Sequence, residues 1–176
     1  MVRLVKGAYW DSEIKRAQER GLASFPVYTS KAATDASYLE GVRLLFAARD
    51  VIYPQFATHN AYTVAAVLEL APAGARYEFQ RLHGMGEALY AAARAEVQEL
   101  PPVRVYAPVG TYQDLLPYLV RRLLENGANS SFVHQFMNPQ IPVEQVVRDP
   151  VASLEAQNDE GARVREPPAQ IGRAHV

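Results

Sequence analysis

Residues 51–72, VIYPQFATHNAYTVAAVLELAP, carry the pattern that decides the fold. The β-branched and aromatic residues at Val51–Phe56 predict a short strand, and the apolar stretch Ala61–Leu70 predicts a helix capped by Asn60. The helix is expected to end before Pro72, because proline cannot continue a helix. A strand followed at once by a helix is one βα unit, from which parallel sheets are built.

The same alternation extends through most of the chain. Strand-like runs begin at residues 2, 25, 51, 77 and 103, so the steps between them are 23, 26, 26 and 26 residues. Each step leaves room for a turn, a short helix and a return loop. We therefore expect an α/β fold with parallel strands covered by helices. The expected strands are Val2–Val5, Phe25–Tyr28, Val51–Phe56, Tyr77–Gln80 and Val103–Tyr106.

The segments between the strands carry recognisable helix ends. Ser, Thr, Asp and Asn accept hydrogen bonds from the first N–H groups of a helix, and glycine permits the turn that ends one. The expected helices are Ser12–Arg20 capped by Asp11, a helix from Thr34 or Asp35 to Arg49, Ala61–Leu70, an alanine-rich helix after Gly86, and a helix that starts at a Thr111–Asp114 capping box, ends at Gly127 and buries Leu115, Leu116, Leu119, Leu123 and Leu124.

The character of the sequence changes after Met137. Five prolines and no aromatic residue follow in the remaining stretch. We expect a short helix near Val143–Arg148 and then an irregular tail. The chain is therefore divided into a β/α domain, residues 1–136, and a linker or tail, residues 137–176.

Composition excludes several classes of function. The 176 residues include 18 basic and 19 acidic ones, so a net charge of −1 offers no basic surface for nucleic acid. Since cysteine is absent, disulfides, thiolate nucleophiles and cysteine metal sites are excluded. No run of about 18 apolar residues could span a bilayer. We expect a soluble protein of a reducing compartment, the cytoplasm.

Polar, aromatic and glycine residues follow four of the expected strands. The carboxyl ends of parallel strands meet at one edge, where β/α proteins bind their ligands. We therefore expect a ligand site at this edge. The segments are RLVKGAYW at residues 3–10, QFATHN at 55–60, QRLHGMG at 80–86 and YAPVG at 106–110.

Metal and dinucleotide signals are weak. His59 and His83 are 24 residues apart and no third ligand stands out, so each is expected to have a hydrogen-bonding or core role. Gly84 and Gly86 would suit a phosphate, but glycine also simply permits a turn into a helix. The classical dinucleotide fingerprint is absent, so a nucleotide cofactor would need another mode of binding.

The helix after Thr111 carries a cluster of polar residues. Tyr118, Arg121, Arg122 and Glu125 lie at offsets of three and four, so they can share one face, with Glu125 paired to Arg121. Two arginines near a site would clamp a carboxylate through paired N–H donors. From the pattern alone, an ordinary solvated helix face with an ion pair is the favoured interpretation.

Four segments resemble the proline dehydrogenase domain of the bifunctional proline-utilisation flavoenzymes of bacteria. The resemblance runs from Val2 to about Val151 in the same order. It implies the C-terminal part of a (β/α)8 barrel, about five βα units, that binds FAD and oxidises L-proline to Δ1-pyrroline-5-carboxylate. The segments are RLVKGAYWDSEIKRAQ (3–18), YPQFATHNAYTVAAV (53–67), YEFQRLHGMGEALY (77–90) and RVYAPVGTYQDLLPYLVRRLLENGANSSFV (104–133).

The resemblance also implies roles for individual residues. Arg3 is expected near the flavin N5 as the arginine of the catalytic site, and Arg121 and Arg122 are expected to hold the proline carboxylate. The walls of the proline pocket are expected to be Tyr9, Leu82, Tyr106 and Tyr118. The expected cofactor contacts are Arg3, Val5, Lys6, Gly7, Ala8, Trp10, Thr58 and His59, with Thr29, Thr34, Asn60, Gln80 and Glu125 as weaker candidates.

Partners follow from the same resemblance. It implies a quinone electron acceptor, peripheral contact with the inner face of the membrane, and a barrel half and an aldehyde dehydrogenase domain outside these residues. Two other functions stay open: a non-catalytic incomplete barrel that needs a partner to cover its sheet edges, and an unrelated barrel enzyme that binds a phosphate or carboxylate substrate.

Overall fold

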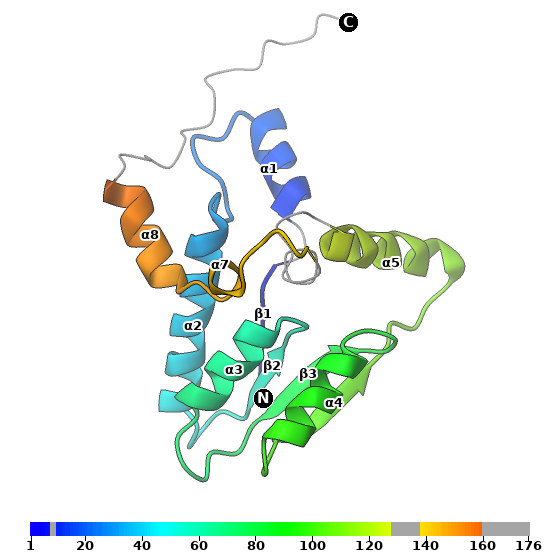
Figure 1. Cartoon of the computed structure of the whole chain (residues 1–176). Coiled ribbons are helices and arrows are strands. Elements are labelled where there is room, and N and C mark those ends of the chain that lie inside the picture. Colours follow the sequence, from blue (N-terminus) through cyan, green and yellow to red (C-terminus); the bar gives the residue numbers. More distant parts are fainter. Residues whose placement is uncertain (8–9, 128–137, 160–176) are drawn as a thin grey trace, which may run out of the picture. The chain divides into compact units, whose positions relative to one another are not determined.

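The computed structural model describes the backbone of residues 1–7, 10–127 and 138–159, and their side chains except at residues 10–11, 123–127 and 157–159. The chain divides into two compact units, one of Met1–Lys6 with Tyr38–Val147 and one of Gly7–Ser37 with Arg148–Val176. The elements, shown in Figure 1, are β1 (Val2–Val5), α1 (Trp10–Glu19), α2 (Lys31–Ala47), β2 (Pro54–Ala57), α3 (Ala61–Leu70), β3 (Glu78–Leu82), α4 (Glu87–Glu96), β4 (Val103–Tyr106), α5 (Tyr112–Gly127), α7 (Val143–Val146) and α8 (Pro150–Asp159).

Within the described residues, the first unit contains a four-stranded sheet in the order β1-β2-β3-β4. Every neighbouring pair is parallel, as the sequence predicts. The register sets Arg3 beside Gln55, Ala57 beside Gln80, and Gln80 beside Arg104. Because successive side chains of a strand point to opposite faces, this register separates an apolar face from a polar one.

The apolar face of the sheet packs against α2, α3 and α4. Phe56 and Phe79 are fully buried there, together with residues from all three helices. Tyr77 makes edge-to-face contacts with Phe46 and Phe56, with ring centroids 5.1 and 5.8 Å apart. Tyr90 of α4 extends this aromatic cluster through Phe79, at 5.8 Å. Aromatic pairs of this kind add about 0.5–1.5 kcal/mol each beyond the area they bury.

The opposite face of the sheet carries polar side chains. Arg3, Gln55, Glu78, Gln80 and Arg104 occupy alternate positions along the four strands, with Phe56 and Phe79 on the opposite face. A parallel sheet covered by helices on both faces would show apolar residues at these positions. The polar face is therefore the part of the first unit whose side chains are suited to binding or catalysis.

One expected strand does not form. Residues 25–28, which the spacing predicts as a second strand, are bends and irregular backbone, so that prediction is wrong. Pro26 has no N–H to donate to a ladder, and Ser24 and Ser30 flank it in a stretch typical of turns. The connection from β1 to its neighbour β2 therefore contains two helices, α1 and α2, without a strand between them.

The helix α8 is a second departure from expectation. The sequence predicts an irregular tail after Arg148, whereas Pro150–Asp159 is a helix. The side chain of Asp149 accepts the N–H of Val151 at 2.9 Å, which caps the helix, and Pro150 occupies the first helical position. Proline suits that position because its missing N–H would have no helical partner there.

The helix α5 begins as expected but buries less than expected. Thr111 accepts the N–H of Asp114 at 3.4 Å and donates its hydroxyl to the Asp114 carboxylate at 2.7 Å. Leu116 and Leu119 are 43% and 44% exposed, so their predicted place in the core is wrong. The leucine period alone could not tell a helix that lies against the sheet from one that lies at the sheet's carboxyl edge (Figure 1).

Candidate functional site

The strands of the first unit all end at one edge of the sheet. β1, β2, β3 and β4 end at Val5, Ala57, Leu82 and Tyr106. The predicted convergence therefore holds for the ends of the four strands and for the segments that follow β2, β3 and β4, because parallel strands in this register place their following residues side by side (Figure 1).

Arg3 reaches across the sheet from β1. Its Nε donates to Oε1 of Gln80 on β3 at 2.8 Å, and its guanidinium lies over the ring of Tyr106 on β4, 4.8 Å from the ring centre. The strand between them presents Ala57, whose short side chain is opposite Gln80. Since strands two apart are about 10 Å apart, only a long side chain crossing a small one can make this contact. Three predicted site residues are thus brought together.

Tyr106 joins this cluster to α5. Burial raises the pKa of its hydroxyl, the positive charge of Arg3 lowers it, and the neighbouring Tyr118 hydroxyl raises it. The guanidinium of Arg122 lies over the ring of Tyr118, 4.8 Å from the ring centre. The middle of α5 therefore contributes Tyr118 and Arg122 to the carboxyl edge.

The arginine pair is not on an open helix face. Arg121 and Arg122 are partly buried, and the Nε atom of each is shielded from solvent. The charge of Arg122 also lowers the pKa of His59, so the two side chains lie near each other. The interpretation favoured from the pattern alone, a solvated face, is therefore wrong. The predicted ion pair with Glu125 lies outside the described side chains.

His59 is held neutral at the end of β2. Its Nε2 accepts the backbone N–H of Leu82 at 3.0 Å. Burial is the main cause that lowers the pKa of His59, and the charges of Arg81 and Arg122 act in the same direction. A neutral imidazole whose Nε2 accepts a hydrogen bond carries its proton on Nδ1. His59 can therefore donate one hydrogen bond from Nδ1 to a ligand.

Thr58 and Asn60 organise the turn from β2 into α3. Oδ1 of Asn60 accepts the N–H of Thr63 at 3.0 Å, which confirms the predicted N-cap. The backbone N–H of Asn60 donates to the Thr58 hydroxyl at 3.1 Å, and the Tyr90 hydroxyl donates to the Thr58 carbonyl at 3.0 Å. These contacts fix the loop that carries His59.

Lys6 extends from the end of β1 toward α3. Its Nζ donates to the hydroxyl of the buried Thr63 at 3.0 Å and lies 5.3 Å from the ring centre of Tyr38. The ammonium group is thus paired with protein groups, among them a hydroxyl and an aromatic face. Val5, one residue earlier, is exposed on the same face of β1 as Arg3.

The loop after β3 depends on two glycines. Gly84 and Gly86 have φ values of +79° and +70°, in the region where L side chains are strained. A Cβ on Gly86 would lie 2.9 Å from Cδ2 of His59. Arg81 closes the loop from the other side, donating to the carbonyls of Leu82 and Met85. The glycines therefore allow the loop to pack directly against the imidazole.

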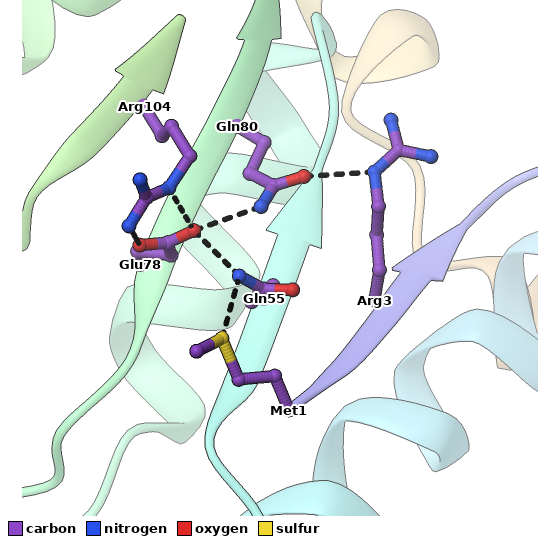
Figure 2. A network of polar contacts seen from close by, with 6 residues as sticks. All are labelled: Met1, Arg3, Gln55, Glu78, Gln80 and Arg104. Carbon is purple, nitrogen blue, oxygen red and sulfur yellow. Dashed lines mark hydrogen bonds and ion pairs between the residues drawn. The ribbon is translucent and has the colours of Figure 1, made fainter. Parts of the chain in front are cut away.

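A polar network inside the strands was missed by the sequence interpretation. Glu78 is 1% exposed, and its carboxylate accepts two hydrogen bonds from Arg104 at 2.7 and 2.8 Å. The side-chain amides of Gln55 and Gln80 each donate to its Oε1 at 2.8 Å (Figure 2). The signal was present in the sequence, because polar residues alternate with Phe56, Phe79 and other apolar residues along the strands.

The network keeps Glu78 ionised. The hydrogen bonds from Arg104, followed by those from Gln80 and Gln55, lower the pKa of Glu78 to about 2 against the opposing effect of burial. The Arg104 side chain is 61% exposed, so the cation itself stays in contact with water. A buried carboxylate with this many donors is stable as an anion at neutral pH.

The remaining predicted site residues fall into three groups: residues of the second unit, residues outside the described part of the chain, and Leu82 at the end of β3. Gly7, Thr29 and Thr34 lie in the second unit, where Thr34 donates its hydroxyl to the Ser30 carbonyl at 3.2 Å. Ala8 and Tyr9 lie outside the described residues, and Trp10 lies outside the described side chains. Their predicted roles stay predictions, as does the wall role of Leu82, which is 2% exposed.

Residues 1–7, 10–127 and 138–159 contain neither a metal-binding cluster of side chains nor a membrane-spanning helix. Among these residues, histidines and acidic side chains nowhere gather in a group of three that could hold a metal ion. Within the same ranges, every helix is too short or too polar to cross a bilayer.

Known proteins are similar to this chain over most of its length. The family model for proline dehydrogenase matches residues 1–135. The bifunctional protein PutA of Escherichia coli (strain K12) is 56% identical over 161 residues, covering 88% of this chain and 12% of that protein. The mitochondrial proline dehydrogenase 1 of Homo sapiens is 33% identical over 147 residues, covering 76% of this chain and 23% of the human protein. The chain thus spans a small part of the length of these relatives.

Solved structures give the same result. A mutant of Bradyrhizobium japonicum proline utilization A superposes with a TM-score of 0.86 at 53% identity, covering 98% of this chain and 18% of that one. Proline utilization A from Bdellovibrio bacteriovorus, inactivated by N-propargylglycine, gives a TM-score of 0.78 at 35% identity, covering 99% and 17%.

Proposed function

The chain belongs to the proline dehydrogenase family, and from that membership we propose that it forms part of a flavin site at which L-proline is oxidised to Δ1-pyrroline-5-carboxylate. The proline dehydrogenase family is a flavoenzyme family, and the parallel sheet with its helices is part of a TIM-like barrel. The observation that carries the proposal is the convergence of Arg3, Tyr106, Tyr118 and Arg122 at the carboxyl edge of that sheet.

The donor set at this edge fits FAD. Arg3 is a cation and His59 offers an Nδ1–H donor, which together suit an anionic nucleotide with a flavin ring. FAD, when bound, supplies a two-electron acceptor for the hydride that leaves C5 of proline. Arg3 contributes positive charge where negative charge accumulates on reduction, and such preorganised charge favours the transfer.

The arginine pair is proposed to orient the substrate. Arg121 and Arg122 would bind the proline carboxylate, because a guanidinium offers two parallel N–H donors to a carboxylate. Tyr106 and Tyr118, whose hydroxyls neighbour each other at the carboxyl edge, would pack against the proline ring together with Leu82 and exclude water. The oxidation balances as one hydride from C5 and one proton from the proline nitrogen, and this scheme assigns no side chain to that proton.

The proposal extends to partners and location. We assign residues 1–136 to the proline dehydrogenase domain, supported by the family match over 1–135, and residues 137–176 to a segment that leads toward an aldehyde dehydrogenase domain. Reoxidation by a quinone would take place at the inner face of the membrane, with the protein in the cytoplasm and in peripheral contact with lipid.

Flavin spectroscopy tests the proposed function. The purified chain is titrated with FAD, and L-proline is then added without oxygen while the flavin absorbance is followed. We expect FAD to bind and proline to bleach its absorbance. A chain that takes up no FAD refutes flavin binding and catalysis by these residues alone, and FAD that binds without bleaching refutes oxidation of proline by this chain.

A substrate analogue tests the arginine pair separately. Tetrahydrofuran-2-carboxylate carries the carboxylate but cannot be oxidised in the same way, so it reports binding alone. Arg122→Ala should weaken its binding by roughly 2 to 5 kcal/mol, since the carboxylate loses a buried charged partner. The control is Arg94→Ala, at an arginine on α4 outside the cluster. Equal binding to Arg122→Ala and the native chain contradicts the substrate assignment.

A further inference from the structure

We propose that Glu78 is a positioning residue for Arg3, acting through the side-chain amide of Gln80. Arg3 is the cation that the proposed function places beside the flavin, so the catalytic consequence rests on that function. The positioning itself rests on contacts within the strands.

The guanidinium of Arg3, the carboxylate of Glu78 and the amide of Gln80 differ in hydrogen-bonding capacity. A guanidinium can only donate, and an ionised carboxylate can only accept. An amide does both, one at each end. Gln80 lies between Arg3 and Glu78, with its Oε1 2.8 Å from the Arg3 Nε and its Nε2 2.8 Å from the Glu78 Oε1 (Figure 2). Because Arg3 can only donate and Glu78 can only accept, only one orientation of the Gln80 amide satisfies both.

The orientation depends on the charge of Glu78. Because Arg104, Gln55 and Gln80 all donate to the carboxylate, the pKa of Glu78 is lowered to about 2 and the group is an anion at neutral pH. If the residue at 78 were neutral and able to donate, a reversed amide at Gln80 would also be satisfied. Reversal would turn an NH₂ group toward the Nε–H of Arg3, and that contact would be lost.

The direction of Arg3 follows from this contact. With its Nε–H bound to Gln80, the terminal nitrogens of Arg3 point away from Gln80 (Figure 2), and the guanidinium lies over Tyr106. A guanidinium is planar, so fixing one N–H and one face fixes the directions of the other donors. Glu78 thus sets the geometry of a cation on another strand, although no contact between the two side chains is needed.

The chain supplies two matched controls. Gln55 donates to the same carboxylate oxygen as Gln80, at the same 2.8 Å, but comes from β2. Arg104 binds the same carboxylate from β4. Gln55→Met and Arg104→Lys each disturb the network around Glu78, but both keep a cation opposite the carboxylate, so the anion and the amide of Gln80 stay in place.

The test follows the Arg3 Nε–H proton in the full 176-residue chain by NMR. The signal is identified by its loss in Arg3→Lys, and its exchange with water is measured. We expect exchange to rise at least about tenfold in Glu78→Gln and in Gln80→Met, because the acceptor is lost. Gln55→Met and Arg104→Lys should change it less than about twofold, because both keep Glu78 paired with a cation.

Two double variants separate positioning from a general loss of structure. Glu78→Gln combined with Gln80→Met should give no faster exchange than either change alone, since both act through one amide. Glu78→Gln combined with Gln80→Glu should restore slow exchange, because a carboxylate at position 80 accepts from Arg3 in either orientation. Folding of each variant is checked by its amide spectrum, and Gln80→Met keeps the buried Glu78–Arg104 ion pair if Glu78→Gln does not fold.

The outcomes distinguish this inference from the proposed function. Unchanged exchange of the Arg3 proton in folded Glu78→Gln or Gln80→Met, or additive effects in their combination, overturns the positioning role. The midpoint potential of bound FAD is measured in the same variants, and a lower potential in Glu78→Gln supports both proposals. Altered Arg3 exchange with an unaltered flavin supports the positioning role and counts against a place for Arg3 beside the flavin.

Discussion

Acid should destabilise the first unit through Glu78. This carboxylate is buried under the hydrogen bonds of Arg104, Gln80 and Gln55, which lower its pKa from 4.5 to about 2. The folded-state pKa is below the unfolded-state value, so the stabilisation is fully present above pH 4.5 and is lost as pH falls toward 2. At about 1.4 kcal/mol per pKa unit, the free energy of unfolding should fall by about 3 kcal/mol from this group.

Urea unfolding followed by circular dichroism measures this loss. The free energy of unfolding of the native chain and of Glu78→Gln is determined at about pH 6 and about pH 2. Other carboxylates contribute equally to both chains, so the native chain should lose about 3 kcal/mol more than the variant. The control is Glu40→Gln, which removes an exposed carboxylate paired with Arg43 at 3.4 Å and should follow the native chain. Equal acid losses, within about 0.5 kcal/mol, in the native chain and Glu78→Gln would falsify the argument.

Three changes test the fold around the site, each by urea unfolding. Gly86→Ala should destabilise by about 1–3 kcal/mol, because the new methyl meets the imidazole at 2.9 Å and the φ is +70°. Gly84→Ala, with a similar φ but nothing within 4 Å, should cost only about 1 kcal/mol, and equal losses would argue against the imidazole contact. Asn60→Ala should cost about 1 kcal/mol through loss of the α3 cap, whereas Asn60→Asp should retain the cap. Phe56→Ala should cost roughly 3–5 kcal/mol as a fully buried ring, with exposed Val51→Ala as the near-neutral control. A Phe56→Ala loss below about 1 kcal/mol would refute the core assignment.

The sequence was most informative where a local signal has one physical meaning. Val103–Tyr106 forms a strand at the predicted bounds, and Asn60 caps α3 as predicted, because both depend on neighbours in the chain. Phe25–Tyr28 failed for the opposite reason: an apolar, aromatic run fits a strand only if a partner accepts its N–H groups, and Pro26 has none to give. Pro150 was interpreted as a helix breaker, although proline also suits a first helical turn.

The candidate site was predictable in its position but not in its connections. The carboxyl ends of the strands followed from the βα pattern, so Arg3, Gln80 and Tyr106 could be chosen before the structure. The contact from Arg3 to Gln80 joins residues 77 positions apart and depends on strand register, which the pattern does not fix. Glu78 was missed because a charged residue inside a strand is unusual, and its partners come from three strands.

The side chain of Arg3, which crosses β2, belongs to a second set of contacts between the strands, in addition to the backbone hydrogen bonds. The backbone ladders link each strand only to the next, in the order β1-β2-β3-β4. The polar side chains connect β1 to β3, two strands away, across Ala57. They also connect β3 to both of its neighbours, β2 and β4, through Glu78. Displacement of β1 alone would therefore also break contacts with β3 and β4, with which it does not pair. These side-chain contacts resist the sliding of neighbouring strands past each other. The geometry of Arg3 is preserved only while the four strands keep their relative positions.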